Sequence, residues 1–132
     1  MNEVTNKDFA HIKIHTQYSI CEGALRTSDL AKYCKTNQIK AVGLCDSHNL
    51  CGALEFSEAI SKSKTQPIIG SQINIQYKNH IGKIPIIAKN LEGYKNLIKL
   101  SSKSYLEIKD TEEPHCSIED LEKYCKGLII LS

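Results

Sequence analysis

The feature that most constrains the fold is a regular alternation of short, β-branched apolar runs with longer segments of helical periodicity. Strands are expected at residues 9–15, 39–45, 67–77, 83–89 and 128–131. Helices are expected at residues 27–34, 52–63 and 94–106, with a short one opened by the capping-box-like run at 117–120. This alternation predicts one α/β domain with a largely parallel sheet, open or barrel-like.

Composition sets mild bounds on the class of protein. The 132 residues, 41% of them hydrophobic, are enough for one domain with a real core. With 17 basic and 15 acidic residues, the overall charge neither requires nor excludes a nucleic-acid partner. No apolar signal segment or stretch of about 20 apolar residues is visible, so a cytoplasmic location is expected.

Six cysteines raise the question of disulfides or zinc. The sequence contains no Cys-x-x-Cys pair and no secretory signal, which disfavours both. Cys34 and Cys125 each follow a tyrosine inside a helical pattern. We therefore expect buried thiols that behave as small hydrophobic side chains.

Polar residues follow the first two strands, at the edge where parallel α/β sheets carry their sites. A strand would gather His11, Lys13 and His15 on one face. A metal site would draw on His15, Glu22 and Asp46, with His48 as a weaker candidate. Lys13 argues against such a site, because a protonated amine has no lone pair and repels a dication.

Several strings point to a known family. They are Phe9–Ser19, Glu22–Leu25, Asp46 with Asn49–Phe56, Lys64–Gly70, Gly93–Leu97 and Gly127–Ser132. Over residues 9–132 the chain resembles the start of the polymerase and histidinol phosphatase (PHP) domain at the N-terminus of the bacterial DNA polymerase III alpha subunit. The resemblance implies that residues 1–132 are the N-terminal portion of a distorted, seven-stranded β/α (TIM-like) barrel with outer helices, within a longer polymerase chain.

Active members of this family hold a metal cluster for phosphoester hydrolysis, in some alpha subunits as a 3′–5′ exonuclease. Carried over residue by residue, the paired histidines of the first motif fall on Lys13 and His15, and the acidic ligand of the next loop on Glu22. The family's Asp-His pair falls on Asp46 and Ser47. The glutamate that follows Ile-Gly falls on Gln72.

Three expected ligand positions thus carry a cation, a hydroxyl and a neutral amide. The resemblance therefore implies a degenerate site with no catalytic residue and no cofactor. Zinc or manganese, held by His15 and Glu22, is the alternative. We also predict that Lys13 pairs with Glu22 or Asp46 in the former cleft.

The resulting hypothesis is a non-catalytic PHP-domain fragment of a DNA-directed DNA polymerase (a nucleotidyltransferase), acting in DNA replication. Its expected partners are the rest of the alpha subunit, the proofreading exonuclease subunit and, through the parent enzyme, DNA. The alternative is a metal-dependent phosphoesterase or 3′–5′ exonuclease. A free-standing small-molecule phosphatase is disfavoured by the strings 49–56 and 93–97. Unpaired strand edges suggest a homodimer.

Overall fold

The computed structural model describes residues 9–109 and 111–131, and it confirms the α/β class. Its strands are β1 His11–Ile14, β2 Ala41–Ser47, β3 Gln66–Tyr77, β4 His80–Ala88, β5 Cys116–Ser117 and β6 Leu128–Ile130. Its helices are α1 Thr27–Thr36, α2 Ala53–Lys62, α3 Leu91–Leu106 and α4 Ile118–Tyr124. The predicted order of elements is therefore correct apart from the short strand β5, which was not predicted, and several boundaries are shifted.

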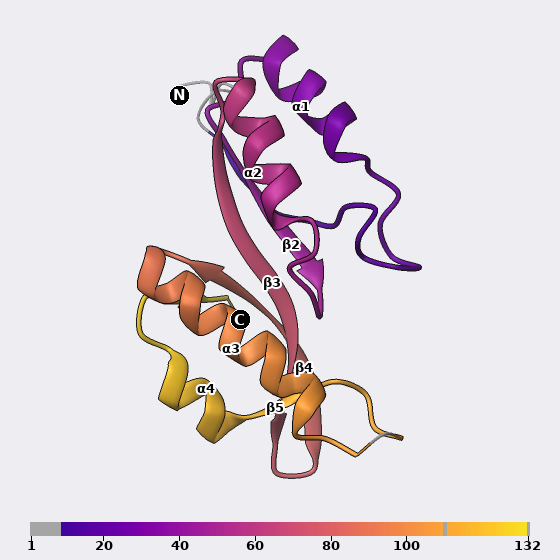
Figure 1. Cartoon of the computed structure of the whole chain (residues 1–132), viewed down its shortest axis with the longest axis vertical. Helices are drawn as coiled ribbons and strands as arrows, with labels where there is room; N and C mark the ends of the chain where they lie inside the picture. The colour runs from indigo at the N-terminus through magenta and orange to yellow at the C-terminus, as the bar shows by residue number, and fades with distance from the viewer. Residues whose placement is uncertain (1–8, 110, 132) are drawn as a thin grey trace, which may run out of the picture.

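One twisted sheet joins the two halves of the molecule. The strand order is β1-β2-β3-β4-β6, and β5 pairs with β3. The pairs β1/β2, β2/β3 and β3/β5 are parallel, whereas β3/β4 and β4/β6 are antiparallel. The long strand β3 runs beneath α2 at one end and beneath α3 at the other (Figure 1). The sheet is thus largely parallel, as predicted.

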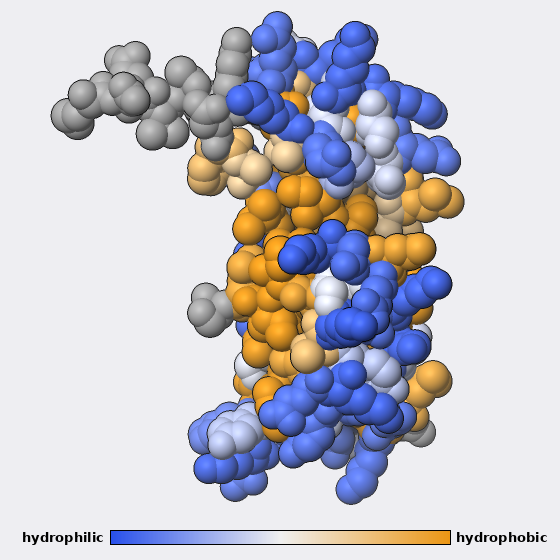
Figure 2. Space-filling view, turned by 90° about the vertical axis from the view of Figure 1, so that its left-hand side faces the viewer, coloured by the Kyte–Doolittle hydropathy of each residue, from blue (hydrophilic) through white to orange (hydrophobic). Residues whose placement is uncertain are grey.

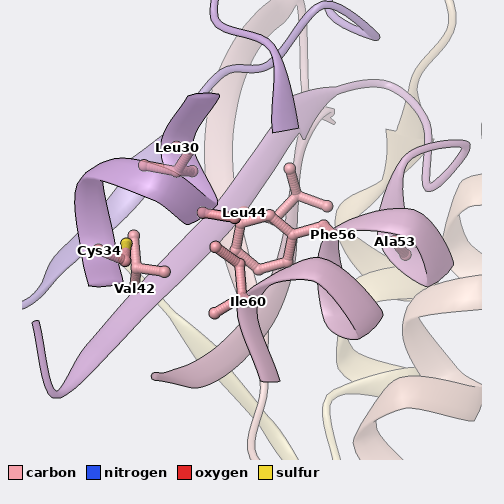
Figure 3. Close-up of a cluster of buried hydrophobic side chains, with 8 residues drawn as sticks. Leu30, Cys34, Val42, Leu44, Ala53, Phe56 and Ile60 are labelled. Atoms are coloured by element: carbon pink, nitrogen blue, oxygen red, sulfur yellow. The ribbon is translucent and has the colours of Figure 1, made fainter. Parts of the chain in front are cut away.

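The first core cluster joins α1 and α2 to β2. Phe56 and Ile60 of α2 are fully buried and meet Leu44 of β2 and Leu30 of α1 (Figure 3). Helical periodicity in the sequence predicts that Leu54, Ala59 and Ile60 face inward, with Phe56 beside them. This prediction is wrong at Leu54, which is 73% exposed, while Ala53 and Phe56 are buried. A shift of one residue turns a helical side chain by about 100°, which explains the error.

The second cluster joins α3 and α4 to the other half of β3 and to β4. Helix α3 begins at Leu91, three residues before the predicted start, because the Asn90 side chain caps it by accepting a hydrogen bond from the Gly93 amide at 2.9 Å. Gly127, which precedes β6, has a φ of +74° and packs on Gly93. A Cβ on Gly93 would lie 1.8 Å from the Gly127 carbonyl oxygen, so this crossing requires glycine.

The cysteine prediction is half right. Cys34, Cys45 and Cys116 are buried free thiols, whereas Cys21, Cys51 and Cys125 are exposed. Burial raises the pKa of Cys45 and of Cys116 to about 11. Within the described ranges, no helix has the length and apolar character needed to cross a membrane.

Candidate functional site

Asp46, at the carboxyl end of β2, holds the loop that follows β1 by hydrogen bonds. Its side chain is fully buried. Oδ1 accepts hydrogen bonds from the Thr16 amide and from Ser19 Oγ, both at 2.6 Å. Oδ2 accepts one from Thr16 Oγ1 at 2.7 Å. Three protein donors therefore occupy this carboxylate, and they fix the loop that follows β1.

Glu22 lies at the end of that same loop and is bound from two sides. Lys83 Nζ lies 2.8 Å from Glu22 Oε1, and Ser47 Oγ donates a hydrogen bond to Oε2. The hydrogen bond from Lys83, followed by that from Ser47, lowers the pKa of Glu22 to about 2. Glu22 correspondingly raises the pKa of Lys83. Glu22 is thus ionised at neutral pH and already carries a cationic partner.

The predicted pairing of Lys13 with Glu22 or Asp46 is wrong. The lysine on Glu22 is Lys83, and Asp46 is held by hydroxyl and amide groups. Lys13 is exposed, makes no ion pair with any residue in 9–109 or 111–131, and lies close enough to Cys45 to oppose the rise in its pKa. The antiparallel register of β3 and β4 places Lys83 opposite Asn74, on a strand that sequence reasoning had not connected to the site.

His11 also leaves the predicted group. A register shift lies between His11, which pairs with Val42, and Ile14, which pairs with Leu44. Both line a groove of about 480 Å³ beside α1, together with Leu25, Leu30 and Tyr33. His15 stays at the site, with Nδ1 3.3 Å from Ser19 Oγ and 3.9 Å from Glu22 Oε2. Exposure along β1 still alternates as expected, because His11 and Lys13 are exposed while Ile12 and Ile14 are half-buried, although the strand contains an irregularity.

Ser47, His48 and Gln72 complete the cluster. Ser47 is in register with Gln72, and the His48 amide donates a hydrogen bond to the Gln72 carbonyl oxygen at 2.8 Å. The side chain of Gln72 is 6% exposed, and its Oε1 has no hydrogen-bond partner among the described residues, nor has Nδ1 of His48. Burial and, to a lesser degree, nearby Lys83 lower the pKa of His48, which favours its neutral imidazole.

A cluster of metal ions needs several His, Cys, Asp or Glu side chains that converge on one place. Across the described part of the chain, no three His, Cys, Asp or Glu side chains are arranged to hold an ion. Of the six positions singled out in the sequence, His15, Glu22, Ser47, Asp46 and Gln72 come together, and Lys13 does not join them. Lys83 is the functional position that sequence reasoning missed.

The PHP domain family model matches residues 11–132. The chain belongs to the PHP domain family. This PHP domain is 40% identical over 125 residues to the DNA polymerase III subunit alpha of Rickettsia prowazekii, covering 94% of this chain and 11% of that one. It is 37% identical over 146 residues to the same subunit of Aquifex aeolicus, covering 96% and 12%. The chain thus spans about a tenth of the length of these curated relatives, and the resemblance found in the sequence is confirmed.

Solved structures share the fold of this PHP domain. A protein from Bifidobacterium adolescentis described as a metal-dependent phosphoesterase matches with a TM-score of 0.57, and an amidohydrolase from Chromobacterium violaceum with 0.58. Each is 15% identical, and each match covers 72% of this chain and 32% of the solved one. At that identity the likeness extends to the fold alone.

Proposed function

We propose that the chain is a non-catalytic PHP-domain portion of a DNA polymerase III alpha subunit, serving DNA replication as a structural module. One observation carries this proposal: both acidic side chains of the site already bind protein groups. Asp46 holds Thr16 and Ser19, and Glu22 holds Lys83 and Ser47. The identity to alpha subunits over most of the chain supports the replicative assignment.

Electrostatics supports the loss of metal binding. Lys83 Nζ lies 2.8 Å from Glu22 Oε1, so an ion bound to that carboxylate would lie beside an ammonium group. Two unit charges of like sign at about 4 Å repel by roughly 4 kcal/mol near a protein surface, and a dication doubles this. Lys83 thus supplies the positive charge that metals would otherwise bring, and it also holds the loop after β1 against β4.

Measurements of bound metal and of phosphoester hydrolysis test whether the chain is metal-free and inactive. The chain is expressed in medium with added zinc and manganese and then purified. It is assayed for bound metal and for release of nitrophenol from bis-nitrophenyl phosphate. The matched comparison is a repaired variant with Lys13→His, Ser47→His, Gln72→Glu and Lys83→Met. We expect metal only in the repaired variant, and stoichiometric metal on the native chain would overturn the proposal.

The partners belong to the same proposal. They are the remainder of the alpha subunit, DNA through that subunit, and a proofreading exonuclease subunit that docks on the PHP domain in the cytoplasm. Co-purification of the tagged chain with the exonuclease of the same organism tests the docking. Failure to retain that subunit at micromolar concentrations of both proteins would count against docking and would leave the metal-free assignment intact.

The second candidate function is a metal-dependent phosphoesterase or 3′–5′ exonuclease. The observation that favours it is the 3.9 Å separation of His15 Nδ1 and Glu22 Oε2, which puts one imidazole and one carboxylate together for a single zinc or manganese ion. Release of nucleotides from a DNA 3′ end, lost in Glu22→Gln, would support it.

A homodimer is a further part of the proposal. Strands β1 and β6 end the path of the sheet, and each therefore offers an edge to a second chain. Light scattering tests this, and a monodisperse monomer at high concentration would exclude it.

A further inference from the structure

Helix α3 carries two apolar faces, and only one of them packs on the sheet. The packed face consists of Gly93, Leu97, Leu100 and Ser104, which are buried. The second face consists of Leu91, Tyr94, Ile98 and Tyr105, spaced by three, four and seven residues. Leu91, Ile98 and Tyr105 are 68%, 41% and 51% exposed. This spacing is that of a helix contact, because residues so spaced align on one side of a helix.

The second face borders a groove between α3 and α2. Leu91 and Tyr94 line a hollow of about 430 Å³ with Pro67 and Ile69 of β3. Tyr94 and Ile69 also line an adjoining hollow of about 240 Å³, whose other wall is Ala53, Leu54 and Ser57 of α2. Seen from the side at which α3 begins, the middle of the molecule shows a broad apolar region between hydrophilic ends (Figure 2).

The topology explains why this groove exists. Strand β3 connects to β4 by a tight hairpin, so no helix lies between α2 and α3 in the chain order, although both helices cover the same side of the sheet (Figure 1). The groove therefore has Leu91 and Tyr94 of α3 as one wall and Ala53, Leu54 and Ser57 of α2 as the other, with Pro67 and Ile69 of β3 as its floor.

We propose that the groove between α2 and α3 binds one amphipathic helix of a partner protein. The helix would present apolar residues at i, i+3 or i+4, and i+7 to Leu54, Ile69 and the second face of α3. Binding would bury side chains that are now more than two-thirds exposed at Leu54 and Leu91. This recognition mode is helix-in-groove binding, in which the apolar face supplies the affinity.

The charges at the rims define the partner further. Lys89 lines the groove at the start of α3, and Lys95 follows Leu91 by one helical turn. Glu58 follows Leu54 by one turn on the opposite wall. The partner helix therefore carries acidic residues along the flank beside α3 and basic residues along the flank beside α2. A second copy of α3 fits poorly, because pairing of two α3 helices would oppose their lysine-bearing flanks.

A synthetic peptide as long as α3 tests the proposal. It has leucines at i, i+3, i+7 and i+10, glutamates on one flank and lysines on the other, and a fluorescent label for anisotropy measurements. We expect saturable binding that falls about tenfold or more in Leu54→Asp and in Ile98→Asp. Ile20→Asp is the matched control, because Ile20 is 85% exposed and lies outside the groove. We expect this variant to bind the peptide with the affinity of the native chain.

Peptides with both flanks acidic or both basic test the charge assignment, and we expect each to bind more weakly than the mixed peptide at low salt. Circular dichroism confirms that each variant is folded. The proposal would be overturned if Leu54→Asp and Ile98→Asp left the affinity for the peptide unchanged, or if no peptide bound. Dimerisation of the free chain that Leu54→Asp abolishes would also overturn it, since the occupant would then be a second copy.

Discussion

Lys83 Nζ lies 2.8 Å from Glu22 Oε1, although 61 residues separate the two in sequence. The contact joins the loop after β1 to the strand that returns from the β3–β4 hairpin. It crosses the cluster that also holds His15 and Ser47. A single ion pair therefore connects two halves of the molecule.

Removing the ammonium should change the titration of Glu22. In Lys83→Met, we expect the pKa of Glu22 to rise from about 2 toward its ordinary value of 4.5. It should not reach that value, because Ser47 still donates a hydrogen bond to Oε2. Carboxyl chemical shifts followed by NMR against pH measure this. Lys62→Met, on the exposed face of α2, is the control, and an equal pKa in both variants would refute the pairing.

The same depressed pKa predicts how stability depends on pH. Because the folded-state pKa of about 2 lies below the ordinary 4.5, the unfolded chain binds more protons between these values. The stabilisation from ionised Glu22 is therefore complete above pH 4.5 and is lost as the pH falls toward 2. Glu22 and Lys83 are 38% and 48% exposed, so the effect should be below about 1 kcal/mol.

Urea unfolding of the native chain and of Glu22→Gln at pH 6 and pH 2 checks that dependence. The difference in unfolding free energy between the two proteins should be larger at pH 6. A constant difference at both values would contradict the linkage.

Asp46→Asn should destabilise the fold by about 2–4 kcal/mol. The carboxylate is fully buried and accepts from three donors, and an amide would turn an N–H group toward at least one of them. Asp29→Asn is the control, since its side chain is 57% exposed and pairs with Lys32 at 3.6 Å. Chemical unfolding curves measure both, and a loss no greater than that of the control would show that Asp46 is not an anchor.

Much of the fold follows from sequence patterns that are local. Apolar β-branched runs alternate with helical periodicity, and neighbouring units of this kind can pack in few ways, so the order of elements and the parallel pairing of β1, β2 and β3 were predictable. The same holds for the gathering of His15, Asp46 and Ser47, because carboxyl ends of adjacent parallel strands meet at one edge. These residues lie in the predicted place.

The placements that the sequence did not predict, those of Lys83 and His11, depend on strand register. Lys83 reaches Glu22 only because Asn74 pairs with Lys83 across the hairpin, and no pattern within β4 specifies that pairing. The register irregularity in β1 between His11 and Ile14 is likewise not specified by any pattern within the strand. A signal was available in the alternation of Gln72, Asn74 and Gln76, which marks one face of β3 as polar, and Asn74 on that face pairs with Lys83.

Thiol reactivity should separate the cysteines into two groups. Cys21, Cys51 and Cys125 are exposed and should react with a disulfide reagent in the native state. Burial raises the pKa of Cys45 and Cys116 to about 11, so their reactive thiolate forms are scarce at pH 8. Mass spectrometry after brief labelling checks this. Modification of Cys45 as fast as Cys51 would show that the sheet opens readily.

The two sides of α2 should respond differently to truncation. Phe56 is fully buried between Leu44 and Ile60, so Phe56→Ala should cost about 3–5 kcal/mol through lost contacts and a residual cavity. Leu54→Ala removes a side chain that is 73% exposed and should cost less than about 1 kcal/mol. Urea unfolding of both variants measures the contrast. A large loss of stability in Leu54→Ala would mean that the groove between α2 and α3 is already occupied in solution. In an unoccupied groove, the Leu54 side chain makes few contacts that truncation could remove.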